Sequence, residues 1–285
     1  MLITLTTDFG TRDGTVAAMK GVMLGLAPQT QLVDVTHEIG PQDVRGAAFT
    51  LWATLPYFPA AGIHVAVVDP GVGSARRALV SATPWGILVG PDNGVFSLIW
   101  EEAPPFETVE VRNPAYLRSE ISATFHGRDV FAPVAAAIAL GVPLDALGPA
   151  VSDPVRLAPP LLCVDGDRWL GEVLHIDRFG NAITSIGRLV RLPDLLQLVP
   201  AFEPHPVAVG ASAPFRLRVM AAGRAIGPVS VTYAEAEPGS PVALIGGTGL
   251  LEIAVNQGNA AQALGLCIGD LVGVLLSAPR EVDLG

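Results

Sequence analysis

The chain has 285 residues, 50% of them hydrophobic, and a formal net charge of −10 at pH 7. This length favours two domains, and this hydrophobic content is enough to bury a large core, which excludes general disorder. The acidic balance disfavours a protein that binds DNA or RNA by neutralising phosphates. We find no long uncharged apolar run and no basic leader, so we expect no membrane span and no signal peptide, and predict a cytoplasmic protein.

The first 140 residues alternate short apolar runs with segments of helical periodicity. This alternation predicts an α/β domain with a mostly parallel sheet over residues 1–155. Helices are predicted over residues 16–26, over 44–55 behind an Asp43 cap, and over 130–140. Strands are predicted over residues 2–7, 32–35, 63–68, 78–83, 86–89 and 106–112, the fourth and fifth of which form a hairpin.

The second half of the chain has a different sequence pattern. Residues 141–162 contain five prolines and little periodicity, which indicates a linker. Beyond it, short strand-like runs alternate with glycine-containing turns, and one helix is predicted over residues 189–198. This pattern predicts a smaller all-β barrel domain over residues 160–285. The strand-like runs cover residues 169–176, 215–220, 229–233, 242–245, 250–255 and 271–276.

Two carboxylates stand where apolar strands of the predicted α/β domain end. Asp8 follows residues 2–7, and Asp69 follows residues 63–68. In an open parallel sheet, ligands bind in the crevice beyond the carboxyl ends of the strands. Two interpretations are open: Asp8 and Asp69 bind a ligand there, or each stabilises a glycine-containing turn.

An arginine and a histidine are candidates for the same edge of the sheet. The glycine turn after Asp69 leads to Arg76 and then into the predicted hairpin, so it is not a Rossmann phosphate loop. An arginine beside Asp69 keeps that carboxyl ionised. His126 precedes the last predicted helix, whose positive end favours a neutral imidazole. Asp69, Arg76 and His126 are able to orient a water molecule together, or to hold a metal; a surface arginine and a loop histidine are the alternatives.

Polar residues also follow the first long strand of the predicted β-domain. Asp177, Phe179 and Asn181 supply an acid, an aromatic ring and an amide within five residues. Such a set is able to bind an amine, a stacked ring and a base edge. The glycine-rich stretch at residues 246–249 is able to present backbone N–H groups to a carboxylate. The alternative for both segments is an ordinary turn.

The sequence carries no strong metal-binding pattern. Cys163 and Cys267 make neither a disulfide framework nor a zinc-ligand set. No pair of histidine, cysteine or carboxylate residues has tight ligand spacing. We therefore expect no metal, and a small molecule rather than a nucleic acid or a membrane as the partner.

Seven motifs, in order along nearly the whole chain, carry a family resemblance. Each is modest alone, and the ordered set is highly specific. Together they resemble the S-adenosyl-L-methionine (SAM) hydroxide adenosyltransferases, the adenosine-forming SAM hydrolases, which are relatives of the SAM-dependent fluorinase and chlorinase. The motifs are Thr7-Asp8-Phe9-Gly10, Pro41-Gln42-Asp43-Val44, Val67-Val68-Asp69-Pro70-Gly71-Val72-Gly73, Gly90-Pro91-Asp92-Asn93-Gly94, Thr124-Phe125-His126-Gly127-Arg128-Asp129, Ile176-Asp177-Arg178-Phe179-Gly180-Asn181 and Leu251-Glu252-Ile253-Ala254-Val255-Asn256.

The resemblance implies an N-terminal α/β domain, a C-terminal β-barrel domain and a homotrimer. It implies that SAM binds between one subunit's N-terminal domain and the next subunit's C-terminal domain. The catalytic Asp, Arg and His of the family fall on Asp69, Arg76 and His126. No metal or further cofactor is implied, because SAM is the substrate.

The resemblance also implies which residues contact the substrate, and Asp69 is one of them. The ribose-diol carboxylate falls on Asp8, the methionine-amine carboxylate on Asp177, and the adenine-binding amide on Asn181.

The resemblance also implies substrate contacts from one further turn and one strand. The turn at Gly247 and Thr248 stands where the halogenases have Ser-Arg, which leaves the methionine carboxylate to backbone N–H groups. Glu252 and Val255 fall in the strand and turn that close the adenine end.

Departures from the halogenases favour water as the nucleophile. The halogenases have Tyr at Asp69, Trp at Gln42 and Ser at Gly127, and the fluorinase has Thr at Val72. Where those enzymes hold a halide, this chain offers an acid, an arginine and an imidazole. We therefore expect hydrolysis of SAM to adenosine and L-methionine by in-line attack of an activated water or hydroxide at C5′. The alternatives are a non-catalytic SAM or adenosine sensor, a SAM-dependent halogenase and a metal-dependent phosphohydrolase.

Overall fold

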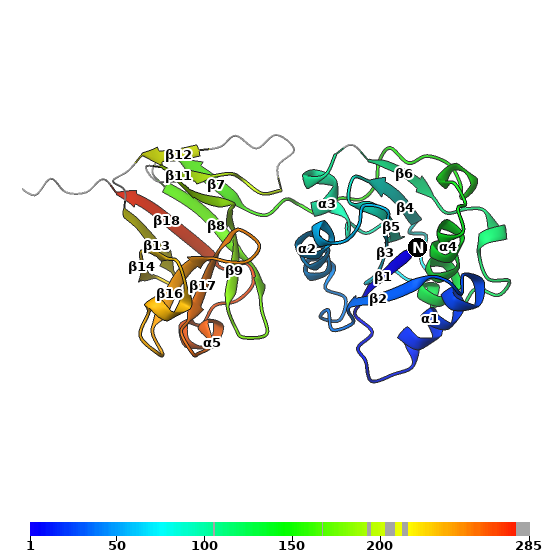
Figure 1. The fold of residues 1–285 in the computed structure, drawn as a ribbon, viewed down its shortest axis with the longest axis horizontal. Helices are drawn as coiled ribbons and strands as arrows, with labels where there is room; N and C mark the ends of the chain where they lie inside the picture. Colours follow the sequence, from blue (N-terminus) through cyan, green and yellow to red (C-terminus); the bar gives the residue numbers. More distant parts are fainter. Residues whose placement is uncertain (105, 167, 193–194, 203–208, 213–215, 278–285) are drawn as a thin grey trace, which may run out of the picture. The chain divides into compact units, whose positions relative to one another are not determined.

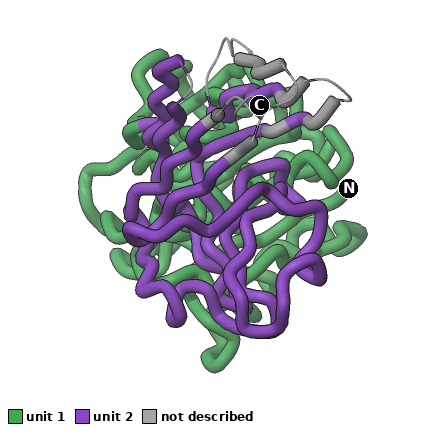
Figure 2. The backbone as a smooth tube through the Cα atoms, turned by 90° about the vertical axis from the view of Figure 1, so that its left-hand side faces the viewer, with its two compact units in different colours: residues 1–158 green, residues 159–285 purple. Residues whose placement is uncertain are grey.

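The computed structural model describes residues 1–285 except 105, 167, 193–194, 203–208, 213–215 and 278–285. The chain forms two compact units, residues 1–158 and residues 159–285, which Figure 2 distinguishes by colour. Each unit has its own hydrophobic core. We describe each unit by itself.

A six-stranded sheet forms the centre of the first unit, with the order β2-β1-β3-β5-β4-β6 (Figure 1). The pairs β1–β2, β1–β3 and β3–β5 are parallel, whereas β4 pairs antiparallel with both β5 and β6. The sheet is therefore mixed, and the expected mostly parallel sheet is only partly correct, because the hairpin β4–β5 reverses the chain. The strands are β1 (Leu2–Thr7), β2 (Gln31–Thr36), β3 (Ile63–Val67), β4 (Ala78–Thr83), β5 (Gly86–Pro91) and β6 (Glu107–Glu110).

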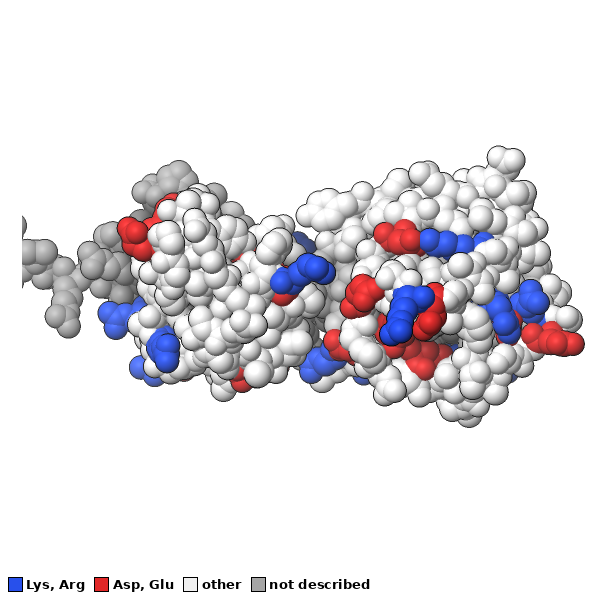
Figure 3. Space-filling model, turned by 90° about the horizontal axis from the view of Figure 1, so that it is seen from below, with Lys and Arg blue, Asp and Glu red and all other residues white. Residues whose placement is uncertain are grey.

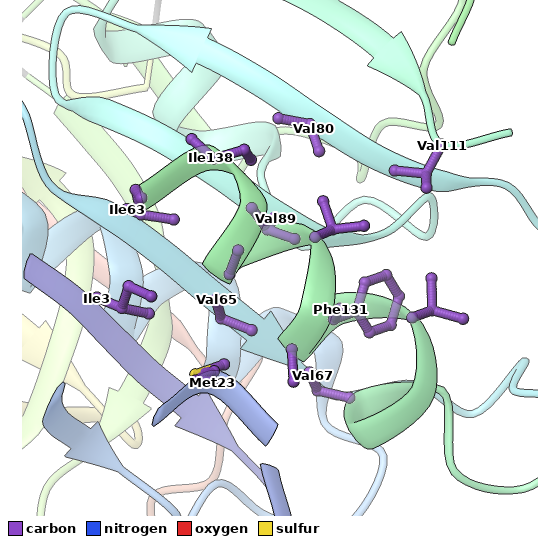
Figure 4. Packing of buried hydrophobic residues seen from close by; sticks show 14 of the residues in the cluster. Ile3, Met23, Ile63, Val65, Val67, Val80, Val89, Val111, Phe131 and Ile138 are labelled. Carbon is purple, nitrogen blue, oxygen red and sulfur yellow. The ribbon is translucent and has the colours of Figure 1, made fainter. Parts of the chain in front are cut away.

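Helices cover both faces of this sheet. Side chains of α1 and α4 pack on one face, with the odd-numbered residues of β1 and β3, while α2 and α3 pack on the other. Figure 4 shows the first of these layers, where Val65 and Val67 point from the sheet toward Phe131. The helical elements are α1 (Thr15–Leu26), α2 (Val44–Thr54), η1 (Leu55–Tyr57), α3 (Ser97–Glu102), η2 (Pro114–Tyr116), η3 (Gly127–Phe131), α4 (Ala132–Ala139) and η4 (Leu144–Ala146).

Local sequence explains these elements. All five residues of β3 are buried, as its run of apolar residues, interrupted only by His64, predicts for a strand covered on both faces. The Asp43 carboxylate accepts a hydrogen bond from the Gly46 N–H at 2.8 Å, which confirms the predicted cap of α2. The last predicted helix begins as a π-helical turn, η3, and continues as α4. Consequently His126 lies directly before a helical N-terminus, as expected.

The predicted linker at residues 141–162 is wrong for most of its length. Residues up to 158 belong to the first unit. Arg77 pairs with both Asp92 and Asp153, at 2.6 and 2.7 Å, and the Val155 N–H donates to Asp92. Most of this segment is therefore held on the first unit by hydrogen bonds and ion pairs rather than forming a free connection.

The second unit is built around a nine-stranded sheet. Its order is β14-β13-β18-β8-β9-β17-β16-β15, with β7 also paired to β8. The end strands approach each other, because β14 contacts β16 and β13 contacts β15, so the sheet curls into a nearly barrel-like form. One short helix, α5 (Ala260–Leu264), departs from the expected all-β composition. The strands of this sheet are β7 (Leu162–Asp165), β8 (Arg168–Ile176), β9 (Ala182–Gly187), β13 (Arg216–Ala221), β14 (Arg224–Gly227), β15 (Val229–Ser230), β16 (Pro241–Ile245), β17 (Leu250–Val255) and β18 (Leu271–Ser277).

The helix predicted over residues 189–198 is wrong. These residues include two antiparallel strands, β10 (Leu189–Leu192) and β11 (Leu195–Leu198), and β11 also pairs with β12 (Val209–Ser212). Pro193 stands in the middle of the predicted helix, where a proline removes a backbone hydrogen bond and disfavours helix continuation. The strand predicted over residues 229–233 is shorter than expected, because η5 (Tyr233–Glu235) follows β15. Phe215, the first residue of another predicted strand, lies outside the described residues.

The surface carries charges of both signs. On the visible face of each unit in Figure 3, blue and red side chains are interspersed among uncharged ones, and no continuous basic surface is seen there. Among the residues that the structure describes, no helix has the length and hydropathy needed to cross a bilayer.

Candidate active site

Asp8 and Asp69 follow neighbouring parallel strands at the same edge of the first sheet. Thr7, the last residue of β1, is the register partner of Val67, the last residue of β3. Asp8 follows Thr7 directly and Asp69 lies two residues beyond Val67. The structure thus places both carboxylates beyond the carboxyl ends of adjacent strands, which is the position that binds ligands in open α/β sheets.

Arg76 binds the Asp69 carboxylate through two nitrogens. Nε lies 3.0 Å from both Oδ1 and Oδ2, and Nη2 lies 2.5 Å from Oδ2. The side chains of Asp69 and Arg76 are only 4% and 10% exposed, so water screens this pair weakly. The loop between them is closed by tight turns, in which the Val72 N–H donates to the Asp69 carbonyl and the Ser74 N–H to the Gly71 carbonyl.

His126 completes a three-residue unit, and its protonation state follows from its neighbour. Nη2 of Arg76 lies 2.7 Å from His126 Nδ1. Because a guanidinium only donates, Nδ1 is the acceptor and the ring proton is on Nε2. Burial and the Arg76 charge lower the pKa of His126 below its ordinary value, against the opposing effect of Asp69 and Asp129. His126 is therefore a neutral imidazole with an N–H donor available at Nε2.

Asp129 holds the segment that carries His126. Its fully buried carboxylate accepts hydrogen bonds from the Ser122 N–H at 2.9 Å and from Arg128 at 2.7 and 2.8 Å, and it pairs with Arg118 at 3.2 Å. The Arg128 hydrogen bond is the main reason that the pKa of Asp129 is lowered. This carboxylate was not predicted as a site residue, although it lies in the same motif as His126.

Two close approaches bring the three loops of this edge together. At Gly73, which has φ of +77°, a Cβ would lie 2.4 Å from the Ala123 carbonyl oxygen, so only glycine permits the contact between these loops. Phe9 packs edge-to-face on Phe125 with ring centroids 6.1 Å apart. The loops that carry Asp8, Asp69 and His126 are therefore mutually packed.

A backbone donor that sequence reasoning missed orients Asp8. The Gln42 N–H donates to Asp8 Oδ2 at 2.8 Å. Gln42 adopts φ of +65°, an uncommon backbone conformation for a residue with a side chain. The contact bridges the loop after β1 and the start of α2, and no local sequence pattern predicts it.

In the second unit, Asp177 and Asn181 form a side-chain-stabilised turn between β8 and β9. Asp177 Oδ1 accepts from the N–H groups of Phe179 and Asn181, both at 2.8 Å, and Oδ2 accepts from the Asn181 amide at 3.0 Å. The turn interpretation and the binding interpretation are compatible, because the turn leaves Phe179 73% exposed beside these polar groups.

An open pocket of about 760 Å³ lies next to this turn, within the second unit. Three predicted residues, Asp177, Asn181 and Val255, line it. Phe179, which the sequence offered as a ring for stacking, also lines it. Its further lining residues, Tyr233, Gln257, Gly258 and Asn259, were not predicted as site residues.

Glu252 and the glycine turn lie near this pocket. The Tyr233 hydroxyl donates to Glu252 Oε1 at 2.6 Å. Burial raises the pKa of Glu252, and the Asp177 charge adds to this effect while the Tyr233 hydrogen bond opposes it. Gly247 and Thr248 form the tip of the turn between β16 and β17, which is closed by the Gly249 N–H donating to the Gly246 carbonyl. The turn exposes Gly247, consistent with a role for backbone groups.

The predicted residues thus gather into two groups, one in each unit. Asp8, Asp69, Arg76 and His126 belong to the first unit, and the predicted residues from Asp177 onward belong to the second. Within the described part of the chain, no three His, Cys, Asp or Glu side chains lie together as a potential metal site.

Comparison with known proteins assigns the chain to a family. Residues 3–148 match the family model of the SAM hydroxide adenosyltransferase N-terminal domain, and residues 171–273 match that of the C-terminal domain. The chain is 44% identical to the (R)-S-adenosyl-L-methionine hydrolase of Salinispora arenicola, covering 95% of this chain and 97% of that protein. It is 45% identical to the protein of the same name from Thermus thermophilus, covering 94% and 97%.

The chain is also similar to a fluorinase and to a solved structure, each at a lower sequence identity. The chain is 29% identical to a fluorinase from an Actinoplanes species, covering 96% of this chain and 97% of that protein. It also resembles the crystal structure of an uncharacterized conserved protein from Thermotoga maritima, with a TM-score of 0.81, 30% identity, and coverage of 96% and 100%. On the two domain matches and these identities, the chain belongs to the SAM hydroxide adenosyltransferase family.

Proposed function

We propose that this protein hydrolyses SAM to adenosine and L-methionine by attack of water or hydroxide at C5′. The observation that carries the proposal is the buried unit in which Arg76 binds both the Asp69 carboxylate and His126 Nδ1. The relatives at 44–45% identity are named (R)-S-adenosyl-L-methionine hydrolases, so we propose the R epimer at sulfur as the substrate.

The chemistry requires an activated nucleophile rather than an acid. The sulfonium leaves as a neutral thioether, so the leaving group needs no proton, whereas water is a poor nucleophile at neutral pH. In our mechanism His126 Nε2–H donates to the water oxygen, and the Asp69 carboxylate accepts a proton from the water. The O–C5′ bond forms as the C5′–S bond breaks, and the bond's electron pair passes to sulfur. Such base assistance supplies about 10²–10⁴-fold in rate, and positioning supplies much of the remainder.

The role of His126 follows from its tautomer. Because Nδ1 already accepts from Arg76, the imidazole has no free acceptor for the proton of water. Asp69 keeps unused lone pairs beside its Arg76 contacts, so it is the available base. Arg76 holds both groups and favours hydroxide character through its charge.

Substrate binding is assigned to residues of both units. We propose that Asp8 accepts hydrogen bonds from the two ribose hydroxyls, and that Asp177 binds the methionine ammonium. Asn181 would bind the adenine edge, while Val255 lines the same pocket. The backbone of Gly247 and Thr248 would hold the methionine carboxylate.

We also propose a cytoplasmic homotrimer that needs no metal or further cofactor. Because the proposed contacts divide between the two units, one SAM molecule must meet both sets. The family resemblance favours sites shared between neighbouring subunits.

The proposal is tested by incubating purified protein with (R)-SAM and separating the products by HPLC and mass spectrometry. Adenosine and methionine, formed equally with and without a chelator, support it. 5′-Chloro-5′-deoxyadenosine in chloride would identify a halogenase, and loss of activity with the chelator a metal-dependent hydrolase. Bound but intact SAM would identify a sensor. The (S) epimer is the matched control and should react at least tenfold more slowly if the site selects the sulfur configuration.

A further inference from the structure

Tyr233 reaches the wall of the second-unit pocket from a segment with little regular structure. It opens the short η5 turn, and its side chain lines the pocket with Phe179 and Val255. Its hydroxyl donates a 2.6 Å hydrogen bond to Glu252 Oε1. This bond fixes the far end of the ring, so the ring's orientation in the pocket wall depends on the position of Glu252.

Glu252 itself is not placed to touch a ligand. It is 5% exposed, and it is not among the residues that line the pocket. Oε1 is engaged by Tyr233, and Oε2 lies so close to Gly246 that a Cβ there would be 2.4 Å from it. The carboxylate therefore sits between the Tyr233 ring and the Gly246–Gly249 turn.

The strand β17 and the residue after it contact the segment from Tyr233 to Gly239 at both of its ends. Glu252 is in the middle of the strand, and Asn256 follows its last residue. The Asn256 amide donates to the Ala236 carbonyl at 2.7 Å, and the Gly239 N–H donates to the Asn256 carbonyl at 2.8 Å. The backbone of this segment is thus anchored through Asn256, while the Tyr233 ring is anchored through Glu252.

We propose that Glu252 is a positioning residue that acts through Tyr233: it holds the Tyr233 ring in the wall of the pocket and thereby sets the affinity for the nucleoside part of the substrate. The proposal rests on SAM being the ligand of this pocket. It gives Glu252 a role through Tyr233, as an alternative to the direct substrate contact that the resemblance implies. It also separates binding from chemistry, because the residues proposed for the chemical step lie in the first unit.

A double-mutant cycle on Tyr233→Phe and Glu252→Ala tests this role. Each single variant should raise KM for SAM and Kd for adenosine by about tenfold, the effect of losing one charge-assisted hydrogen bond. The double variant should be no worse than either single variant, since both remove the same link. The value of kcat should stay within about twofold of wild type. Glu252→Gln keeps an acceptor for the hydroxyl and should restore most of the affinity. Tyr57→Phe, at an exposed tyrosine of the first unit, is the matched control and should change nothing.

Three outcomes would overturn the proposal. Additive losses would mean that Glu252 acts on the ligand independently of Tyr233. Lower thermal midpoints with unchanged KM and Kd would mean that the pair is only structural. A wild-type protein that binds neither SAM nor adenosine by calorimetry would remove the ligand on which the proposal rests. Failure of the proposed function can be told apart from failure of this proposal. If the wild type binds adenosine but does not turn over SAM, the double-mutant cycle can still be measured through Kd for adenosine.

Discussion

Arg76 Nη2 lies 2.7 Å from His126 Nδ1 and 2.5 Å from Asp69 Oδ2, so a single nitrogen connects the imidazole with the carboxylate. The orientation of each of these three side chains therefore depends on the other two. The arginine holds the carboxylate in place through its nitrogens, and with burial it keeps the imidazole neutral, with its N–H at Nε2. The following predictions depend on this arrangement and on the loops that support it.

The first prediction concerns pH. Burial and the Arg76 charge lower the pKa of His126 below the ordinary 6.5, so the neutral ring persists at neutral pH and is lost only under acid conditions. We expect kcat/KM for SAM to fall on the acid side with a midpoint below 6.5. In Arg76→Met the repulsion disappears, and the pKa of His126 measured by NMR should rise. The resonance is assigned by its absence in His126→Gln. A titration that stays the same or moves downward in Arg76→Met would contradict the arrangement.

The second prediction concerns the contact between Gly73 and Ala123. Gly73→Ala places a Cβ against the Ala123 carbonyl at a positive φ, which should displace the loop that carries Arg76 and reduce kcat at least 100-fold. Gly141→Ala is the matched control: it has φ of +92° and open space around the new Cβ. The control should lose about 1–2 kcal/mol of stability from its backbone conformation and keep its kcat. Equal kinetic losses in both variants would show that the contact does not position the site.

The third prediction concerns His64, at the opposite end of β3 from Asp69. Burial lowers its pKa to about 4; Nδ1 contacts the Thr4 hydroxyl at 2.9 Å, and Nε2 contacts the Trp85 carbonyl at 3.2 Å. A lowered folded pKa means that the unfolded chain binds the proton more tightly. Stability is therefore full above pH 6.5 and falls as the pH drops toward 4, by up to about 3 kcal/mol.

The measurement is the free energy of unfolding from urea titrations between pH 7.5 and 4. His64→Gln cannot take up this proton, so its stability should fall less steeply over the same range, whatever its absolute level. Parallel pH profiles for wild type and His64→Gln would show that His64 does not cause the loss.

The fourth prediction concerns the proposed trimer. If each site takes Asp69 from one subunit and Asp177 from the next, Asp69→Asn and Asp177→Ala are each inactive, yet mixed trimers contain some intact sites. Co-refolding equal amounts should restore about a quarter of the wild-type activity, since the subunits assort at random. Light scattering should give three times the chain mass. No recovery in mixtures that have exchanged subunits, verified with a tag on one variant, would place each site within a single chain.

Much of the architecture could be predicted because local patterns determine it. The run at residues 63–67, apolar except for His64, predicts a strand covered on both faces, and Asp43 marks a helix start through its side chain. The helix expected over residues 189–198 was wrong because its leucines follow a helical spacing, while Pro193 and strand pairing with distant residues favour extended structure. The periodicity of a segment does not indicate which other strand it pairs with.

The site shows the same division. The placement of Asp8, Asp69 and His126 could be predicted because strand ends and helix starts are visible in sequence. The Gln42 N–H at Asp8 and the Tyr233 hydroxyl at Glu252 could not be, since each joins residues 34 or 19 positions apart through tertiary packing. The sequence does not show that Asp129 supports this segment, because its contacts with Arg118 and the Ser122 N–H arise only when the chain folds back.

The most direct test of the central claim, that Asp69, Arg76 and His126 activate water, is turnover of (R)-SAM in H₂¹⁸O with products read by mass spectrometry. We predict adenosine that carries one ¹⁸O, formed by the wild type and slowed at least 100-fold in Asp69→Ala and in His126→Ala, both still folded and able to bind SAM. Unlabelled adenosine, or label incorporated at an undiminished rate by both variants, would contradict the account.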